Sequence, residues 1–110
     1  MSGEIAVDID SFYKLVEASN KRFPEGVRPY QMATRLLEEC GEVAAEINHW
    51  EGSGIKRQKY GEPRKDNLAN ELKQAITELF KIVVYYSVKE ELEESINQSL
   101  QRVKNEGLID

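Results

Sequence analysis

The sequence predicts an all-α protein, a bundle-like fold of four antiparallel helices. Apolar residues recur at helical spacing through most of the 110 residues, and this recurrence is the main signal of amphipathic helices. Clusters of proline and glycine interrupt the pattern and divide it into segments of helix length. Strict alternation of apolar and polar residues, which is typical of a half-buried strand, is almost absent. Because the composition shows no break along the chain, we expect one domain over residues 1–110.

The first two helices are expected on either side of a break that contains proline. The first helix begins after Asp8 or Asp10, either of which suits an N-cap, and runs over residues 12–23. Residues 24–29 include two prolines and a glycine, which end that helix. The second helix covers residues 29–50, with proline in its first position and glycines just beyond its end.

The third and fourth helices follow a polar segment. Residues 51–65 are rich in lysine and arginine and are expected to form a loop. The third helix then covers residues 66–86. The sequence SVKE at residues 87–90 matches a capping box, so we expect the last helix to begin there and to end near Gly107. This helix carries one apolar stripe, which consists of Val88, Leu92, Ile96, Leu100 and Val103.

Composition and charge exclude several classes of protein. The net charge of −5 provides no electrostatic footprint for binding a nucleic-acid polymer. Cys40 is the only cysteine, so no disulfide can form within the chain, and a reducing compartment fits best. No apolar run approaches the roughly 18 residues of a membrane helix, and the first residues lack the features of a signal peptide. We therefore expect a cytoplasmic protein that does not associate with a membrane.

Carboxylates crowd the second expected helix. In the sequence RLLEECGEVAAEINHW, residues 35–50, the acidic side chains are Glu38, Glu39, Glu42 and Glu46. Like charges one turn apart destabilise a helix unless water and salt screen them or a cation lies nearby. At about 100° per residue, the last three of these acids share a strip with Arg35, and Glu38 lies at its outer margin. The strip borders the expected core side, which contains Leu36, Cys40, Val43, Ala44 and Ile47.

The third expected helix has a similar acidic edge. Glu71 and Glu78 lie two turns apart beside an apolar side that contains Leu72, Ile76, Leu79 and Val83. If the two apolar sides pack together, the two acidic edges converge. A group of carboxylates between two helices is the kind of site that binds a hard divalent cation through oxygen. The alternative is a pair of solvated helix surfaces, and for the glutamates of residues 90–94 a solvated surface is the expectation.

Other side chains carry weaker signals. Cys40 is expected to be a buried small hydrophobe, and His49 a surface or capping residue. Trp50, at the end of an apolar stripe, is expected to pack in the core or an interface. The tyrosines at residues 85–86 are expected in the core and in an interface. Because short helices expose more apolar surface than one small bundle covers, we expect a homodimer or homotetramer.

Two segments resemble the MazG-like family of all-α nucleotide pyrophosphohydrolases. They are LLEECGEVAAEI, residues 36–47, and NLANELKQAITELFKIVVYY, residues 67–86. The family pattern is EExxE on one helix and ExxD on the next, separated by a variable spacer. The first element is matched by Glu38, Glu39 and Glu42, and Glu71 matches the start of the second. Related all-α enzymes include dimeric dUTPases and phosphoribosyl-ATP pyrophosphatases.

This resemblance implies a house-cleaning enzyme that hydrolyses a nucleoside triphosphate to its monophosphate and pyrophosphate. The implied cofactor is Mg²⁺, with Mn²⁺ as a substitute, and the implied metal ligands are Glu39, Glu42, Glu71, Gln74 and Glu78. Glu38 is the candidate to orient or deprotonate the attacking water. The candidate substrate-binding residues are Arg35, Trp50, Lys56, Arg57, Lys59, Arg102 and Lys104. The basic loop could equally be an exposed, solubilising segment.

One residue departs from the family pattern, since Gln74 stands where ExxD has its aspartate. An amide is neutral and a weaker ligand for Mg²⁺ than a carboxylate. Either the carbonyl oxygen of Gln74 binds the metal, or Glu78 supplies the missing charge one turn later, or the site has lost catalysis. The third case gives a second hypothesis, a non-catalytic helical interaction or nucleotide-sensing module. A phosphoribosyl-ATP or dUTP specialist is a further alternative.

Overall fold

The computed structural model describes residues 3–26, 28–52 and 55–110. Over these ranges it has no strand, which confirms the all-helical prediction. No helix within them is both long enough and apolar enough to cross a membrane. The elements in chain order are α1 (Ile9–Arg22), the 3₁₀ turn η1 (Pro24–Gly26), α2 (Pro29–Trp50), α3 (Lys56–Tyr60), α4 (Lys65–Tyr86) and α5 (Lys89–Asn105).

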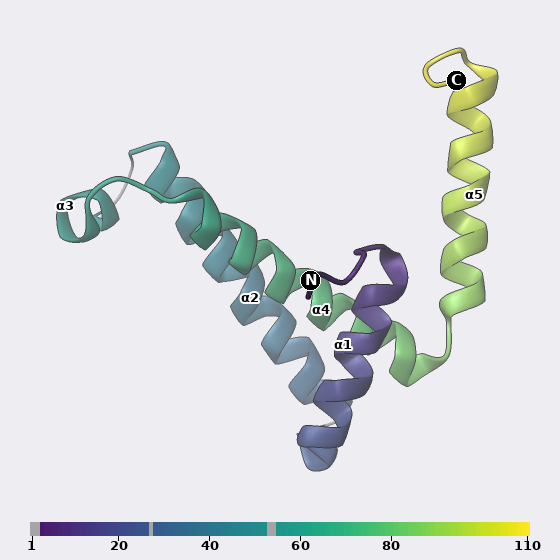
Figure 1. Cartoon of the computed structure of the whole chain (residues 1–110), viewed down its shortest axis with the longest axis horizontal. Coiled ribbons are helices and arrows are strands. Elements are labelled where there is room, and N and C mark those ends of the chain that lie inside the picture. The colour runs from purple at the N-terminus through teal and green to yellow at the C-terminus, as the bar shows by residue number, and fades with distance from the viewer. Residues whose placement is uncertain (1–2, 27, 53–54) are drawn as a thin grey trace.

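Helix α4 is the central element of the fold (Figure 1). Helix α2 packs along it, and α1 packs against its C-terminal half. Helix α5 meets α4 only near the turn that joins them and then stands away from the other helices (Figure 1). The radius of gyration is 17.3 Å, whereas a compact domain of this length has a value of about 13 Å. The fold is therefore an open one, with α5 unsupported along most of its length.

The helix ends agree only in part with the predicted caps. Asp8 is the N-cap of α1, as predicted, and it forms a capping box with Ser11. The Ser11 backbone N–H donates to Asp8 Oδ1 at 3.2 Å, and the Asp8 N–H donates to Ser11 Oγ at 3.1 Å. The capping box predicted over residues 87–90 is wrong. Ser87 is instead the C-cap of α4, with a left-handed φ of 55°, and Val88 precedes α5 without a side-chain cap.

The segment predicted as a loop over residues 51–65 contains the short helix α3. His49 anchors this region to the end of α2, because its Nε2–H donates to the carbonyl oxygen of Gly61 at 2.7 Å. The His49 side chain is buried, so the expectation of a surface histidine is wrong. A lone histidine on a helix does not reveal from sequence that a later segment folds back over it.

The conventional core lies between α1 and its neighbours. Val16 of α1 and Met32 of α2 are fully or almost fully buried. Phe80 of α4 stacks on Phe12 with ring centroids 5.3 Å apart and meets the edge of Tyr13 at 4.9 Å. These aromatic contacts join α1 to α4.

The predicted core side of α2 is only partly correct, since Leu36 and Val43 are half-buried. Cys40 and Ala44 are exposed, and Ile47 is 51% exposed, whereas Glu46 is buried.

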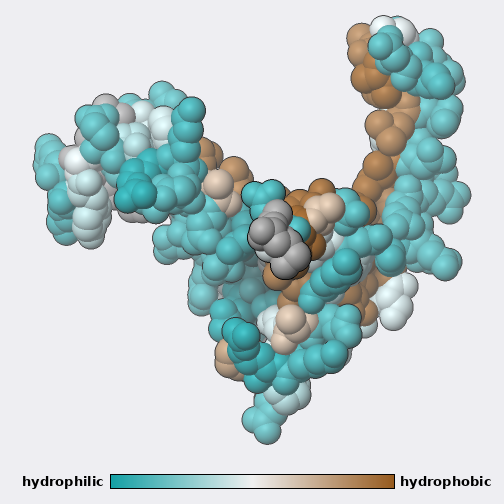
Figure 2. Space-filling view, viewed as in Figure 1, coloured by the Kyte–Doolittle hydropathy of each residue, from teal (hydrophilic) through white to brown (hydrophobic). Residues whose placement is uncertain are grey.

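Helix α4 shows the same mixture, since Ile76 and Val83 are half-buried whereas Leu79 is 48% exposed. Glu39 of α2 and Glu78 of α4 border the same hollow, so the contact of the two helices includes part of each acidic edge. Figure 2 shows brown patches of hydrophobic residues on the surface of the molecule.

Candidate functional site

A hollow of about 300 Å³ lies where α1, α2 and α4 meet. It contains four residues that the sequence singled out, from two different helices: Arg35, Glu39, Gln74 and Glu78. The other lining residues are Ser19, Asn20, Phe23, Met32 and Lys81. The packing of α2 against α4 therefore brings part of the EExxE element close to part of the degenerate ExxD element.

Glu78 is the most buried acid of this hollow, with 5% of its surface exposed. Its Oε1 accepts a hydrogen bond from Lys81 Nζ at 2.9 Å, one helical turn further along α4. Its Oε2 is buried and has no hydrogen-bond partner. Leaving a buried carboxylate oxygen without a donor costs free energy, so this atom is set to accept a further donor or a cation.

Glu39 has a pKa above its ordinary value. Burial of the carboxyl is the largest cause, and the negative charges of Glu71, Glu78 and Glu42 add to it, while Arg35 acts in the opposite direction. Glu71 is half-buried and Glu42 is exposed, and neither lines the hollow. The predicted carboxylates thus share one electrostatic neighbourhood, although only two of them border the same space.

The donor atoms around the hollow suit a hard divalent cation. Mg²⁺ prefers carboxylate and carbonyl oxygens, which Glu39, Glu78 and Gln74 can provide. The buried, unpartnered Oε2 of Glu78 is the structural feature that fits such an ion. Within the described ranges, however, no three acidic, histidine or cysteine side chains are grouped closely enough to form a ready-made metal site. Lys81 supplies the positive charge next to Glu78 in this arrangement.

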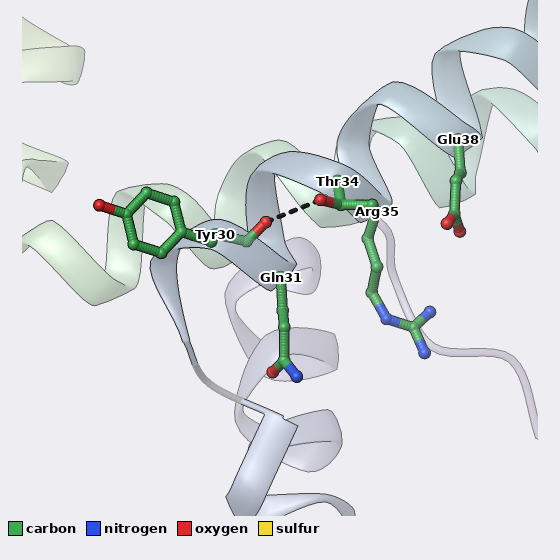
Figure 3. Close-up of a pocket in the computed structure, with 5 residues that line it drawn as sticks. All are labelled: Tyr30, Gln31, Thr34, Arg35 and Glu38. Atoms are coloured by element: carbon green, nitrogen blue, oxygen red, sulfur yellow. Dashed lines mark hydrogen bonds between the residues drawn. The ribbon is translucent and has the colours of Figure 1, made fainter.

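A second hollow, of about 500 Å³, lies beside the first half of α2 (Figure 3). Tyr30, Gln31, Thr34, Arg35 and Glu38 line it. The Thr34 hydroxyl donates to the Tyr30 carbonyl oxygen at 2.9 Å. Glu38 is exposed here and does not line the hollow that contains Glu39, whereas Arg35 borders both spaces. Arg35 is therefore the link between the candidate catalytic residue and the candidate metal ligands.

The predicted substrate-binding residues at the end of α2 lie apart from these hollows. Trp50 is half-buried in the last turn of α2, and Lys59 is exposed in α3. Neither residue lines either hollow. The side chains of Lys56 and Arg57 lie outside the part of the structure that is described.

The predicted phosphate-binding residues of the last helix are also distant within one chain. Arg102 and Lys104 lie in the last turn of α5 and are exposed. Because α5 stands away from the other helices (Figure 1), the structure does not bring these two cations to the hollows.

Sequence reasoning missed Lys81 and the polar end of α1. Lys81 follows Glu78 by three residues, and this spacing alone indicates an ion pair on one helix surface. Ser19 and Asn20 had no comparable signal, because their approach to α4 depends on how α1 packs.

Comparison of the chain with models of protein families, with curated proteins and with solved structures found no match. The MazG-like resemblance therefore stays a prediction.

Proposed function

We propose that this protein is a Mg²⁺-dependent nucleoside triphosphate pyrophosphohydrolase of the MazG-like type, which converts a nucleotide to its monophosphate and pyrophosphate. The observation that carries the proposal is the Glu78 carboxylate, buried and with one unpartnered oxygen, in a hollow that also holds Glu39 and Gln74. Buried carboxylates without full partners are concentrated at functional sites because they are unfavourable elsewhere.

In this proposal Glu39, Glu78 and the Gln74 carbonyl oxygen hold the metal, and Glu42 and Glu71 add negative charge around it. Bound Mg²⁺ would supply positive charge that offsets the negative charge of a triphosphate and of the transition state of its hydrolysis. The pKa of Glu39 is raised first by burial of the carboxyl and second by the neighbouring glutamates, and a cation bound beside it offsets both effects.

The chain's own cations bind the polyphosphate. The Arg35 guanidinium borders both hollows, and its planar fork suits two phosphate oxygens at once. Lys81, which pairs with Glu78 and lines the same hollow, provides a second cation for the phosphates. Glu38, in the hollow on the other side of Arg35, orients or deprotonates the attacking water.

The proposal also includes the form of the substrate, the cellular location and the oligomeric state. The substrate is a free nucleotide, since a chain with a net charge of −5 lacks the basic surface that a nucleic-acid polymer requires. We propose a cytoplasmic location and a homodimer or homotetramer of antiparallel helices. The exposed leucines of α4 support an oligomer.

The direct test is pyrophosphate release from a panel of ribo- and deoxyribonucleoside triphosphates with Mg²⁺. We expect release from the wild type and a loss of about 100-fold or more in Glu78→Gln, because the variant loses a charged metal ligand. The matched control is Glu17→Gln, which neutralises an exposed glutamate of α1. Absence of release from every nucleotide, or full activity in Glu78→Gln, would overturn the proposal.

A second candidate function is a non-catalytic nucleotide-sensing or interaction module. Two observations favour it: Gln74 replaces the expected acid, and Lys81 already pairs with Glu78. In that case the ammonium group has taken over the structural role of the metal.

Titration of Mn²⁺ by calorimetry separates the two candidates. The enzyme hypothesis predicts saturable binding in the wild type that Glu42→Gln weakens, and tighter binding in Gln74→Asp together with faster pyrophosphate release. The module hypothesis predicts no binding in the wild type, and binding without activity in Gln74→Asp.

A further inference from the structure

Helix α5 carries an apolar stripe whose middle is exposed to solvent, while Leu92 and Val103 near its two ends are half-buried. Its stripe contains Ile96, which is 42% exposed, and Leu100, which is 49% exposed. Leu108 and Ile109 extend the exposed apolar surface beyond the end of the helix. Figure 2 shows these hydrophobic residues in brown along the edge of α5 that faces the rest of the molecule, with hydrophilic residues on the opposite edge.

A helix in this position needs a partner. Seventeen residues form about five turns, and most of the stability of such a helix comes from packing its apolar side rather than from intrinsic propensity. Within the chain, α5 contacts α4 only near their junction. Within the described residues, most of this apolar stripe therefore has no other helix packed against it.

The start of α5 is tied to α1. The Nζ atom of Lys89, the first residue of α5, lies 3.7 Å from Asp10 Oδ1 and 4.5 Å from the centre of the Tyr13 ring. Ser87, in its left-handed conformation, ends α4 and turns the chain outward. These contacts orient α5 away from the other helices (Figure 1) and favour an intermolecular partner.

The charges of α5 indicate which partner fits. Its first half carries Glu90, Glu91, Glu93 and Glu94, and its last turn carries Arg102 and Lys104. Such a helix is complementary to a second copy of itself that runs in the opposite direction, because acidic and basic ends then meet twice. When Leu92 faces the partner's Val103 in an antiparallel pair, Glu91 lies on the same side of the pair as the partner's Arg102, and Glu93 lies on the same side as the partner's Lys104.

We propose that α5 pairs antiparallel with α5 of a second copy of this chain, through the stripe of Leu92, Ile96, Leu100 and Val103. This pairing is independent of the enzymatic proposal, since it uses none of the residues of the two hollows. It gives the oligomer a two-fold, self-complementary interface.

Sedimentation velocity over a range of protein concentrations tests the pairing. We expect a dimer for the wild type, and a dimer dissociation constant at least about tenfold higher for Leu100→Glu, because each dimer loses two buried leucines. The matched control is Gln101→Glu, which adds the same charge on the polar side and leaves the dimer intact.

A charge exchange tests the orientation. The pair Glu91→Lys with Glu93→Lys makes both ends of α5 basic, and the pair Arg102→Glu with Lys104→Glu makes both ends acidic. Each double variant alone is expected to be more weakly dimeric than the wild type, and a mixture of the two is expected to form a heterodimer.

Three outcomes would overturn the proposal. One is a wild type that is monomeric with a radius of gyration near 13 Å by X-ray scattering, because α5 would then fold onto its own chain. The second is a dimer that Leu100→Glu does not weaken, which would assign dimerisation to another surface. The third is a mixture of charge variants that does not associate, which would exclude the antiparallel arrangement.

Discussion

The α2–α4 pair and helix α5 differ in which of their side chains are buried. Between α2 and α4, Glu46 and Glu78 are buried while Ile47 and Leu79 are largely exposed. In α5 the glutamates of residues 90–94 are exposed, as predicted, and the apolar residues form one regular stripe. Both elements are amphipathic by sequence, yet only α5 separates its two sides in the expected manner.

The difference shows that amphipathicity does not decide which side of a helix packs. Burying acids is unfavourable unless they are paired or hold a cation. In α2–α4 the buried Glu78 is paired with Lys81 through one oxygen, and its second oxygen, which has no hydrogen-bond partner, is the atom on which the proposed metal site depends. In α5 the exposed stripe has the simpler explanation of an interface, since apolar surface left in water is stabilised by a second molecule.

The largest effect is expected where the fold has its most conventional core. Phe80→Ala removes both ring contacts with α1, and we expect a loss of about 3 kcal/mol in the free energy of unfolding, measured by urea titration. Tyr30→Ala, at an exposed position, should change this free energy by less than about 0.5 kcal/mol. Equal effects of the two substitutions would contradict the view that α1 and α4 form the core.

Removing the ammonium partner of the buried acid should be the next largest effect. Lys81→Met leaves Glu78 buried and uncompensated, and we expect a loss of about 1–3 kcal/mol in the free energy of unfolding. Combining it with Glu78→Leu should recover most of the loss, because the uncompensated charge is then gone. The exposed Lys73→Met is the control. A double variant less stable than Lys81→Met would show that Glu78 stabilises the fold by itself.

The pH dependence of stability isolates the acidic edge of α2. Because the folded-state pKa of Glu39 is raised, its contribution to stability is present below the unfolded-state pKa and is lost as pH rises through the folded-state pKa. Glu39→Gln should therefore gain stability relative to the wild type as pH rises from about 4 toward neutrality. Urea titrations at several pH values measure this difference, and exposed Glu17→Gln provides the comparison. A difference that shrinks with rising pH would refute the assigned cause.

Saturating Mn²⁺ should remove the advantage in stability that Glu39→Gln has over the wild type at neutral pH. Saturating Mn²⁺ binds the folded wild type through Glu39 and raises its free energy of unfolding at neutral pH, while Glu39→Gln gains less. Addition of a chelator should return the wild type to its original stability. Equal stabilisation of both proteins would remove Glu39 from the proposed ligand set.

The smallest effect is expected at the junction of the two regions. Ser87 adopts a left-handed conformation that glycine adopts without a steric penalty, so Ser87→Gly should stabilise the protein by about 0.5–1 kcal/mol. Ser99→Gly, inside α5, should instead destabilise it by about 0.5 kcal/mol. Thermal unfolding of both variants gives the comparison, and a destabilised Ser87→Gly would contradict the assignment of strain.

The helix positions were largely predictable because they depend on local chemistry. Asp8 as an N-cap and the proline at the start of α2 each act within one turn, so their effects can be read from neighbouring residues. The exception at Ser87 has a local reason as well. The same four letters fit a capping box and the end of a preceding helix, and only the path of the chain distinguishes them.

Only part of the lining of the candidate site was indicated by the sequence, namely Arg35, Glu39, Gln74 and Glu78. The spacing of Glu39 and Glu78 indicated that two acidic edges could meet, and they border one hollow. The packing differs in part from the expected one, because Ile47 and Leu79 are largely exposed while Glu46 and Glu78 are buried. Lys81 beside Glu78 and the end of α1 beside the hollow depend on contacts between helices, which spacing along one helix does not report.

The sequence by itself determined that this chain forms helices, where most of them begin and end, and that acids are concentrated on two of them. These properties follow from propensity, capping and periodicity, which act over a few residues. Only the tertiary structure decided which side of each helix is buried, that Glu78 is buried beside Lys81, and that α5 leaves its stripe exposed. Those outcomes depend on how α1, α2 and α4 compete for the same surfaces, and that competition is settled by the packing of the whole chain.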